Sequence, residues 1–250
     1  MIETKKLTYK NILKDISISN KYPLIIIAGP VASGKTILSK IINGDIETKE
    51  QVYLDNKCQE SYKTLEYYKK VRLINAEYIN KEMTIKDDLN QCIEDHKIEI
   101  VSKEKLEEYE LYKYRNCDIK DLSIENQIKY SLLKSIISKP ENIILDSIDD
   151  YLEEEYLIDV IDKLKALNIK TIMLSRRLDL GVYSSYMYII SKGRILLEGL
   201  PLEVMKEENI LNKIGLSLPY MADLSVKLID YDLLDNIEND IEELVRKLWN

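Results

Sequence analysis

The sequence predicts an α/β fold in which a parallel sheet is covered on both faces by helices, with an antiparallel β edge. Short apolar runs alternate with helical stretches, which is typical of parallel sheets. The runs that we expect to form strands are 24–28, 71–74, 143–145, 171–174 and 188–190. A glycine-rich loop directly follows the first of them. The 250 residues, 45% of them hydrophobic, suffice for one large domain or one domain with an inserted subdomain.

The loop carries the complete pattern G-x-x-x-x-G-K-[ST] of a phosphate-binding loop. It consists of Gly29, Pro30, Val31, Ala32, Ser33, Gly34, Lys35 and Thr36. Backbone N–H groups of such a loop wrap phosphate, and the start of the next helix, expected at 37–42, adds partial positive charge. We expect Lys35 to reach the β- and γ-phosphates of ATP and Thr36 to bind Mg²⁺. A chance glycine turn is the alternative, but the flanking strand and helix argue against it.

A second residue with an expected role in ATP binding is the aspartate that follows the run 143–145. In proteins with a phosphate loop, such a carboxylate lies beside the loop and holds the Mg²⁺ shell together with the loop hydroxyl. Aspartates after strands are common, so this prediction depends on the complete loop about 110 residues earlier. With that loop present, we predict that Asp146 is the carboxylate on the metal side.

The remaining segments predict an inserted and an appended helical part. Alternating runs in 1–20 predict a β-hairpin at the sheet edge. A strand is expected at 51–54, short and crossover helices at 61–70 and 152–167, and a hairpin through 192–193 that ends in a strand at 194–197. A region of helical periodicity at about 78–138 predicts a helical subdomain. We therefore predict a nucleotide-binding domain over 1–205 and a helical extension over 206–250.

Composition excludes several other classes of protein. The 36 basic and 44 acidic residues give a net charge of −8, which argues against nucleic acid as a partner. A signal peptide and a membrane-spanning run are both missing from the sequence, so we expect a cytoplasmic protein. Cys58, Cys92 and Cys117 are far apart and lack a histidine cluster, so we expect neither a disulfide nor a zinc site. His96, the sole histidine, is expected to have no chemical role.

The order of these parts resembles the ATP-binding cassette (ABC) ATPases, and among them the ATPase subunits of energy-coupling-factor (ECF) importers. The resemblance covers nearly the whole chain, including 7–9, 122–126, 173–177, 199–204 and 211–219. It implies that Tyr9 stacks on adenine. It also implies a homo- or heterodimer with a second ABC ATPase subunit, attached to the cell membrane through an integral membrane transporter subunit.

Two positions depart from the family pattern where catalysis is expected. The glutamate that polarises the attacking water should follow Asp146, but Ser147 stands there. A serine cannot act as that base. The family's switch histidine is replaced by Arg177, which is either a solvated arginine or a contact to the γ-phosphate.

The signature segment is altered too. The family motif LSGGQ corresponds to Leu122-Ser123-Ile124-Glu125-Asn126. In the motif, glycines let the backbone approach the γ-phosphate bound by the partner subunit. Ile124 and Glu125 place bulk and negative charge there instead. The family's glutamine is also missing from 75–77.

Three functions remain open from the sequence. The first is an ATP-binding subunit of an ABC/ECF-type importer, with weak or absent hydrolysis of its own. The second is a non-catalytic regulatory or structural pseudo-ATPase. A small-molecule kinase is a weaker third, because such enzymes usually have an arginine-rich lid, whereas the middle region offers mostly Glu and Lys.

Overall fold

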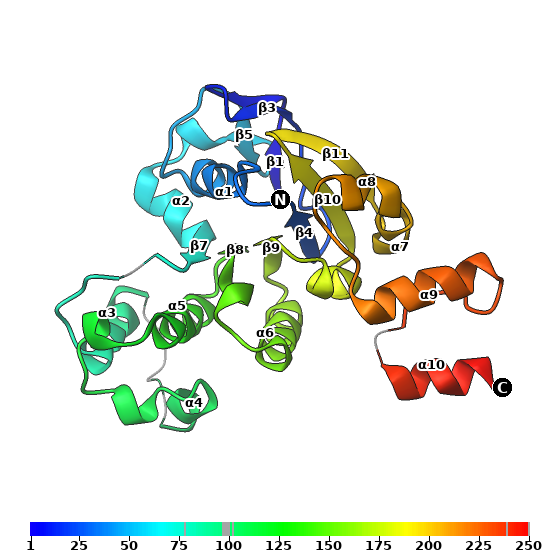
Figure 1. The fold of residues 1–250 in the computed structure, drawn as a ribbon. Coiled ribbons are helices and arrows are strands. Elements are labelled where there is room, and N and C mark those ends of the chain that lie inside the picture. Colours follow the sequence, from blue (N-terminus) through cyan, green and yellow to red (C-terminus); the bar gives the residue numbers. More distant parts are fainter. Residues whose placement is uncertain (78, 97–100, 102, 239, 250) are drawn as a thin grey trace.

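The computed structural model describes residues 1–77, 79–96, 101, 103–238 and 240–249 (Figure 1). In these residues the main sheet has the order β11 (Arg194–Gly199), β10 (Tyr186–Ser191), β4 (Leu24–Ala28), β9 (Lys170–Ser175), β8 (Asn142–Asp146) and β7 (Val71–Asn75). Neighbouring strands from β10 to β7 are parallel, and β11 pairs with β10 in the antiparallel direction. The predicted parallel core with an antiparallel edge is therefore confirmed.

Both faces of this sheet are covered, which explains why its strands read as continuous apolar runs. All five residues of β4 are buried. Leu24 and Ile26 belong to the core shared with α5 (Ile124–Ser138) and α6 (Glu154–Ala166), whereas Ile25 and Ile27 belong to the core shared with α1 (Lys35–Asn43). Because side chains alternate between the faces of a strand, a single run fills both cores.

The first strands form smaller sheets beside the main one. β1 (Ile2–Thr4) pairs with β5 (Val52–Leu54), which pairs with β6 (Lys57–Cys58). The hairpin expected in 1–20 is β2 (Leu7–Tyr9) with β3 (Leu13–Ile16), and it forms a separate two-stranded sheet. A hydrogen bond of 2.8 Å from Lys14 N to Gly193 O connects this hairpin to the turn between β10 and β11 of the main sheet.

The described residues between β7 and β8 are largely helical. After α2 (Thr64–Lys70) and β7 come α3 (Ile85–His96), α4 (Lys103–Glu108) and α5, with short 3-10 turns between the last two. Asp88 is buried and fastens α3 to α5, since its carboxylate accepts hydrogen bonds from Tyr130 and, at 2.7 Å, from Lys134. The side chain of His96 lies outside the described residues.

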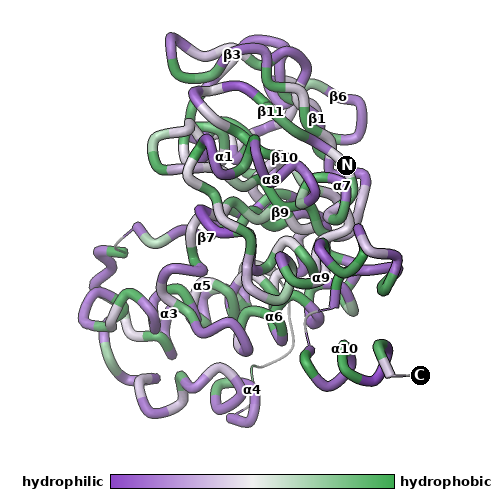
Figure 2. Tube along the Cα trace, turned by 45° about the vertical axis from the view of Figure 1, so that its right-hand side comes forward, coloured by the Kyte–Doolittle hydropathy of each residue, from purple (hydrophilic) through white to green (hydrophobic). Residues whose placement is uncertain are grey.

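Four helices follow β11, namely α7 (Pro201–Met205), α8 (Glu208–Lys213), α9 (Tyr220–Asp230) and α10 (Ile241–Leu248), among the described residues. Leu211, Ala222 and Val226 are buried in the same core as α5 and α6. The predicted extension therefore packs on the domain up to α9. Hydrophobic and hydrophilic positions alternate along α10, which lies at the C-terminal end of the chain (Figure 2). Of the described helices, none has both the length and the apolar character needed to cross a membrane.

Candidate functional site

The phosphate loop lies between β4 and α1, so the predicted strand-to-helix junction is present. Gly34 precedes α1 with a φ of 102°, in the left-handed region that favours glycine. A Cβ atom there would lie 2.7 Å from Leu13 Cδ2 of the β2–β3 hairpin. Gly34 thus allows the loop to turn into the helix while the hairpin packs against it.

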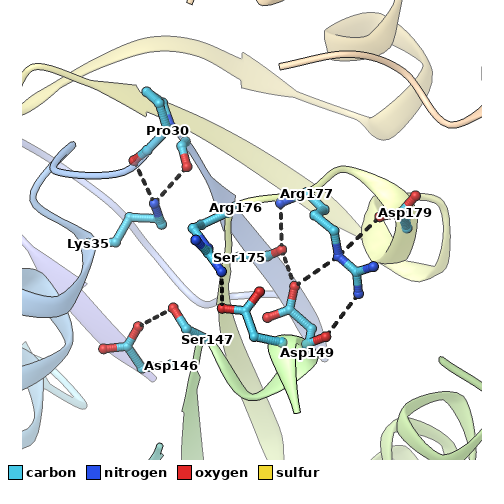
Figure 3. A network of polar contacts seen from close by, with 11 residues as sticks. Pro30, Lys35, Asp146, Ser147, Asp149, Ser175, Arg176, Arg177 and Asp179 are labelled. Atoms are coloured by element: carbon cyan, nitrogen blue, oxygen red, sulfur yellow. Dashed lines mark hydrogen bonds and ion pairs between the residues drawn. The ribbon is translucent and has the colours of Figure 1, made fainter. Parts of the chain in front are cut away.

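Lys35 is held inside the loop by neutral acceptors (Figure 3). Its Nζ donates to Gly29 O at 2.6 Å, to Pro30 O at 3.0 Å and to Ser33 Oγ at 3.1 Å. Within the described parts of the chain, no carboxylate lies within 4.0 Å of this ammonium group. Burial lowers the pKa of Lys35 to about 8, an effect that the charge of Asp146 opposes. A buried cation without a counter-ion suits a phosphate group.

Asp146 ends β8 and is buried beside α1. The Ser39 hydroxyl donates to Asp146 Oδ2 at 2.7 Å and lies 2.9 Å from the main-chain carbonyl oxygen of Thr36, so it connects the Asp146 carboxylate to the backbone of α1. Ser147 Oγ donates to Asp146 Oδ1 at 3.2 Å. Carboxylate and hydroxyl oxygens are the ligands that Mg²⁺ prefers, and the ion usually takes one or two protein groups together with phosphates. The Asp146 carboxylate and the Thr36 hydroxyl are groups of the kind that suits a Mg²⁺ bound with ATP, and their binding of the metal stays a prediction.

Ser147 follows directly after β8, where the family's base would stand. Its φ is 56°, and its N–H donates to Leu174 O at 2.9 Å. These contacts fix the backbone at the end of the sheet. The short neutral side chain offers a hydroxyl group and no carboxylate at this place.

Arg177 is bound by carboxylates after β9. Its Nε lies 3.6 Å from Asp149 Oδ2 and 3.3 Å from Asp179 Oδ2, and its Nη2 donates to Asp149 O at 3.0 Å. Ser175 Oγ donates to Asp149 Oδ2 at 2.6 Å. Burial raises the pKa of Asp149, whose Oδ1 has no protein hydrogen-bond partner among the described residues. Arg177 therefore clamps the loops after β8 and β9 together.

The neighbouring Arg176 was not singled out from the sequence, and neither was Asp149. Arg176 Nη2 pairs with Asp150 Oδ2 at 2.6 Å. Figure 3 shows its side chain between Lys35 and Asp149, whereas the guanidinium of Arg177 lies farther from the loop. The charge of Arg176 contributes to the lowered pKa of Lys35. The sequence does contain a signal for these residues. Asp149 and Asp150 follow the strand run 143–145, and two arginines follow the strand run 171–174.

Tyr9 lies in β2 and packs, partly buried, against the core that contains α1. Lys10 Nζ lies 5.1 Å from the centre of its ring. Gly193 ties this region to the phosphate loop, since its N–H donates to Ser33 O at 3.1 Å and its carbonyl accepts from the hairpin residue Lys14. The structure thus brings the hairpin and the loop together, and adenine stacking stays a prediction.

The altered signature forms the start of α5. Ser123 is its N-cap and accepts a hydrogen bond of 3.3 Å from Asn126 N. Ile124 is 36% exposed, and the exposed Glu125 pairs with Lys129 Nζ at 2.7 Å. This ion pair offsets part of the negative charge that Glu125 would bring to a facing phosphate.

The fold and the loop define a protein of the phosphate-loop NTPase class. A family model described as ABC transporter matches residues 13–148, and the chain belongs to this family.

The chain is similar in sequence to curated proteins and in fold to solved structures. The chain is 26% identical to the energy-coupling factor transporter ATP-binding protein EcfA of Pediococcus pentosaceus, over 99% of this chain and 98% of that protein. It is also 26% identical to EcfA1 of Clostridioides difficile, over 98% and 93%. Among solved structures, cbiO1 of Clostridium perfringens, part of the ABC transporter complex cbiONQ, has a TM-score of 0.65 at 17% identity and covers 86% of this chain and 94% of its own. The ATP-binding cassette MJ0796, a dimer bound to ADP and phosphate, has a TM-score of 0.67 at 20% identity, over 80% and 99%.

We expect ATP affinity to depend on pH through Lys35. Above a pKa of about 8 the free protein loses the Lys35 proton, whereas a bound phosphate favours the ammonium form. Binding at higher pH therefore requires proton uptake, and affinity should fall by up to about tenfold per pH unit above 8. Calorimetry at pH 7.5, 8.5 and 9.5 in two buffers of different ionisation enthalpy would measure both quantities. Constant affinity with no proton uptake would contradict this prediction.

Proposed function

We propose that this chain is an ATP-binding subunit of an ECF-type importer, which binds Mg²⁺-ATP at its phosphate loop and hydrolyses it weakly or not at all. Three observations together carry the proposal: Lys35 is buried with no carboxylate within 4.0 Å in the described residues, Asp146 lies beside α1, and Ser147 stands in place of a base. The names of the EcfA relatives support the importer part of the proposal.

Different parts of the chain would carry out nucleotide binding and pairing with a second subunit. We assign nucleotide binding to 1–205, with the helical subdomain at about 78–138, and pairing to 206–250. Bound Mg²⁺ would neutralise phosphate charge. The residues that would hold it are Thr36 and Asp146, while Lys35 would hold the phosphates and Tyr9 the adenine. The partners are a second ABC ATPase subunit and an integral membrane subunit, which would place the chain on the cytoplasmic side of the cell membrane.

A regulatory or structural role is the second candidate function, and the ion pairs of Arg177 favour it. Asp149 and Asp179 occupy Arg177, the residue that stands for the switch histidine. A site that binds nucleotide without a base or a free switch residue would report or stabilise an assembly instead of driving it. ATP affinity and phosphate release, measured on the same purified sample, test the two parts of the proposal separately. Without measurable ATP affinity, both candidates fail.

We expect α10 to contribute to pairing. Ile241, Val245 and Trp249 recur every four residues and are 60%, 46% and 79% exposed, which is an apolar stripe on one side of the helix. Replacing Ile241 and Val245 by glutamine should shift the dimer towards monomer, because burial of a large apolar side chain contributes about 1.5–3 kcal/mol. Light scattering with ATP, alone and with a co-expressed ATPase, would measure this shift.

The matched control changes a neighbouring polar stripe of α10. Glu242→Gln with Arg246→Gln alters two exposed positions of the same helix and should leave pairing unchanged. These substitutions test the surface better than removal of 206–250 would, because Leu211, Ala222 and Val226 are part of the core. Equal pairing of both variants and the wild type would exclude α10 from the interface.

A further inference from the structure

We propose that the cavity at the C-terminal end of α1 binds a small organic cation of the alkylammonium class. The cavity has a volume of about 500 Å³, within the range of about 300–1,000 Å³ that is usual for small-molecule sites. Its walls come from the end of α1, the segment that follows it, the turn after β6 and α2 (Figure 1). The phosphate loop lies at the opposite end of α1, so this inference goes beyond the proposed function.

The amide of Asn43 offers an acceptor that the protein leaves unused. Asn43 ends α1, lines the cavity and is only 7% exposed. Its Nδ2 donates to Asp45 Oδ1 at 2.9 Å. Because an ionised carboxylate can only accept, this bond fixes the orientation of the amide and leaves Oδ1 as an acceptor. Within the described residues, Asn43 Oδ1 is buried without a partner, which is costly unless a ligand donates to it.

A second unused group lines the same cavity. Thr48 Oγ1 is buried and likewise has no hydrogen-bond partner in the described chain. The donors nearby are already engaged, since Gln59 Nε2 and the Tyr67 hydroxyl donate to Ile42 O at 3.1 and 2.7 Å. The cavity therefore has acceptors to spare. An ammonium group, which has three donors and no acceptor, complements them.

The charges around the cavity favour a cation as well. The C-terminal end of a helix carries partial negative charge. Glu47 and Glu60 add two carboxylates to the lining, against the single ammonium group of Lys49. A phosphate or carboxylate ligand would meet charges of its own sign here, whereas an ammonium ion would meet opposite ones.

Aromatic residues in the lining favour an organic cation over a metal ion. Tyr62, Tyr67 and Tyr68 line the cavity, and the rings of the first two lie 5.8 Å apart, edge to face. Aromatic rings attract ammonium groups, and Lys57 Nζ already lies 4.4 Å from the centre of the Tyr62 ring. Among the described residues, no group of three or more histidine, cysteine or acidic side chains could hold a metal ion.

The test is calorimetry on the full chain without nucleotide, in about 0.15 M NaCl to screen the general attraction of cations to an acidic protein. The probe is 1,4-diaminobutane. Its matched ligands are 1,4-butanediol, which has no charge, and succinate, which has the opposite charge. We expect one equivalent of the diamine to bind with a Kd of about 1 mM or lower, and the other two ligands to show no measurable binding.

Paired substitutions locate the bound diamine. Glu47→Gln with Glu60→Gln should weaken its binding by at least about tenfold, because hydrogen bonds to charged groups are the strong ones. Glu198→Gln with Glu242→Gln removes the same charge from exposed positions outside the cavity lining, and should change the affinity less than about twofold.

The unused acceptors are tested separately. Asn43→Leu should also weaken diamine binding by at least about tenfold. Unfolding curves would show whether this buried substitution keeps the fold. If it does not, Thr48→Val, which keeps the side-chain shape, should still weaken binding by about threefold.

Three outcomes would overturn the inference. A cavity that holds only water would give no diamine binding. Equal binding of 1,4-butanediol would show that charge does not matter, and equal losses in the two glutamine pairs would show a general attraction to the acidic surface. Because ATP is absent from the assay, a failure of diamine binding leaves the proposed function untouched, and a failure of ATP binding leaves this inference untouched.

Discussion

Replacing Lys35 by alanine should weaken Mg²⁺-ATP binding by at least about a hundredfold, since hydrogen bonds to charged groups contribute about 1.5–3 kcal/mol each. Lys35 Nζ now donates to two carbonyl oxygens and a hydroxyl inside the loop. When a phosphate oxygen replaces these neutral acceptors, the buried ammonium group of Lys35 gains a negatively charged partner. The binding constant from calorimetry, at a pH below 8 where Lys35 is protonated, measures the loss.

The control for this variant is Lys40→Ala. Lys40 lies on the same helix, is partly exposed and pairs with Glu77 at 2.5 Å. Its removal should change ATP affinity less than about twofold, because screened surface ion pairs contribute little. Unfolding curves would confirm that both variants keep the fold. Equal ATP affinity of Lys35→Ala and the wild type would mean that nucleotide does not bind at this loop.

Much of this fold could be predicted because its signals are local. The apolar runs at 24–28, 71–74 and 143–145 correspond to β4, β7 and β8, whose ends lie within one or two residues of the expected ends. Strands buried on both faces leave a continuous apolar run in the sequence. The complete loop pattern likewise located the junction of β4 and α1, since only glycine suits the backbone of Gly34.

The rest of the candidate site depends on contacts between distant segments. Pairing of β1 with β5 joins residues about 50 positions apart, and local alternation in 1–20 carries no information about it. The ion pair between Asp149 and Arg177 depends on the order of strands in the sheet. Because β8 and β9 are neighbours, the loops that follow them lie side by side. The sequence could show opposite charges after two strands, but not which arginine would lie beside Lys35.

The purified chain should release phosphate from ATP at less than about 0.1 s⁻¹, because loss of a general base typically costs 10²–10⁴-fold from an enzyme median near 10 s⁻¹. Ser147 places a neutral hydroxyl where a carboxylate is needed, and its Oγ already donates to Asp146. Phosphate release, measured against Lys35→Ala as background, gives the turnover of this site alone. Turnover near the enzyme median that Lys35→Ala abolishes would show that another residue supplies the base.

Restoring the carboxylate should not restore activity. Ser147→Glu places a second acid next to Asp146, while Arg177 stays bound to Asp149 and the signature keeps Ile124 and Glu125. Catalytic groups that act on one transition state are not additive, so we expect less than about a tenfold gain over the wild type. Ser147→Gln, which has the same size without the charge, is the matched control and should show no gain. A gain of about a hundredfold or more in Ser147→Glu alone would mean that the missing base is the main reason for weak hydrolysis. It would also mean that the ion pairs of Arg177 do not limit turnover.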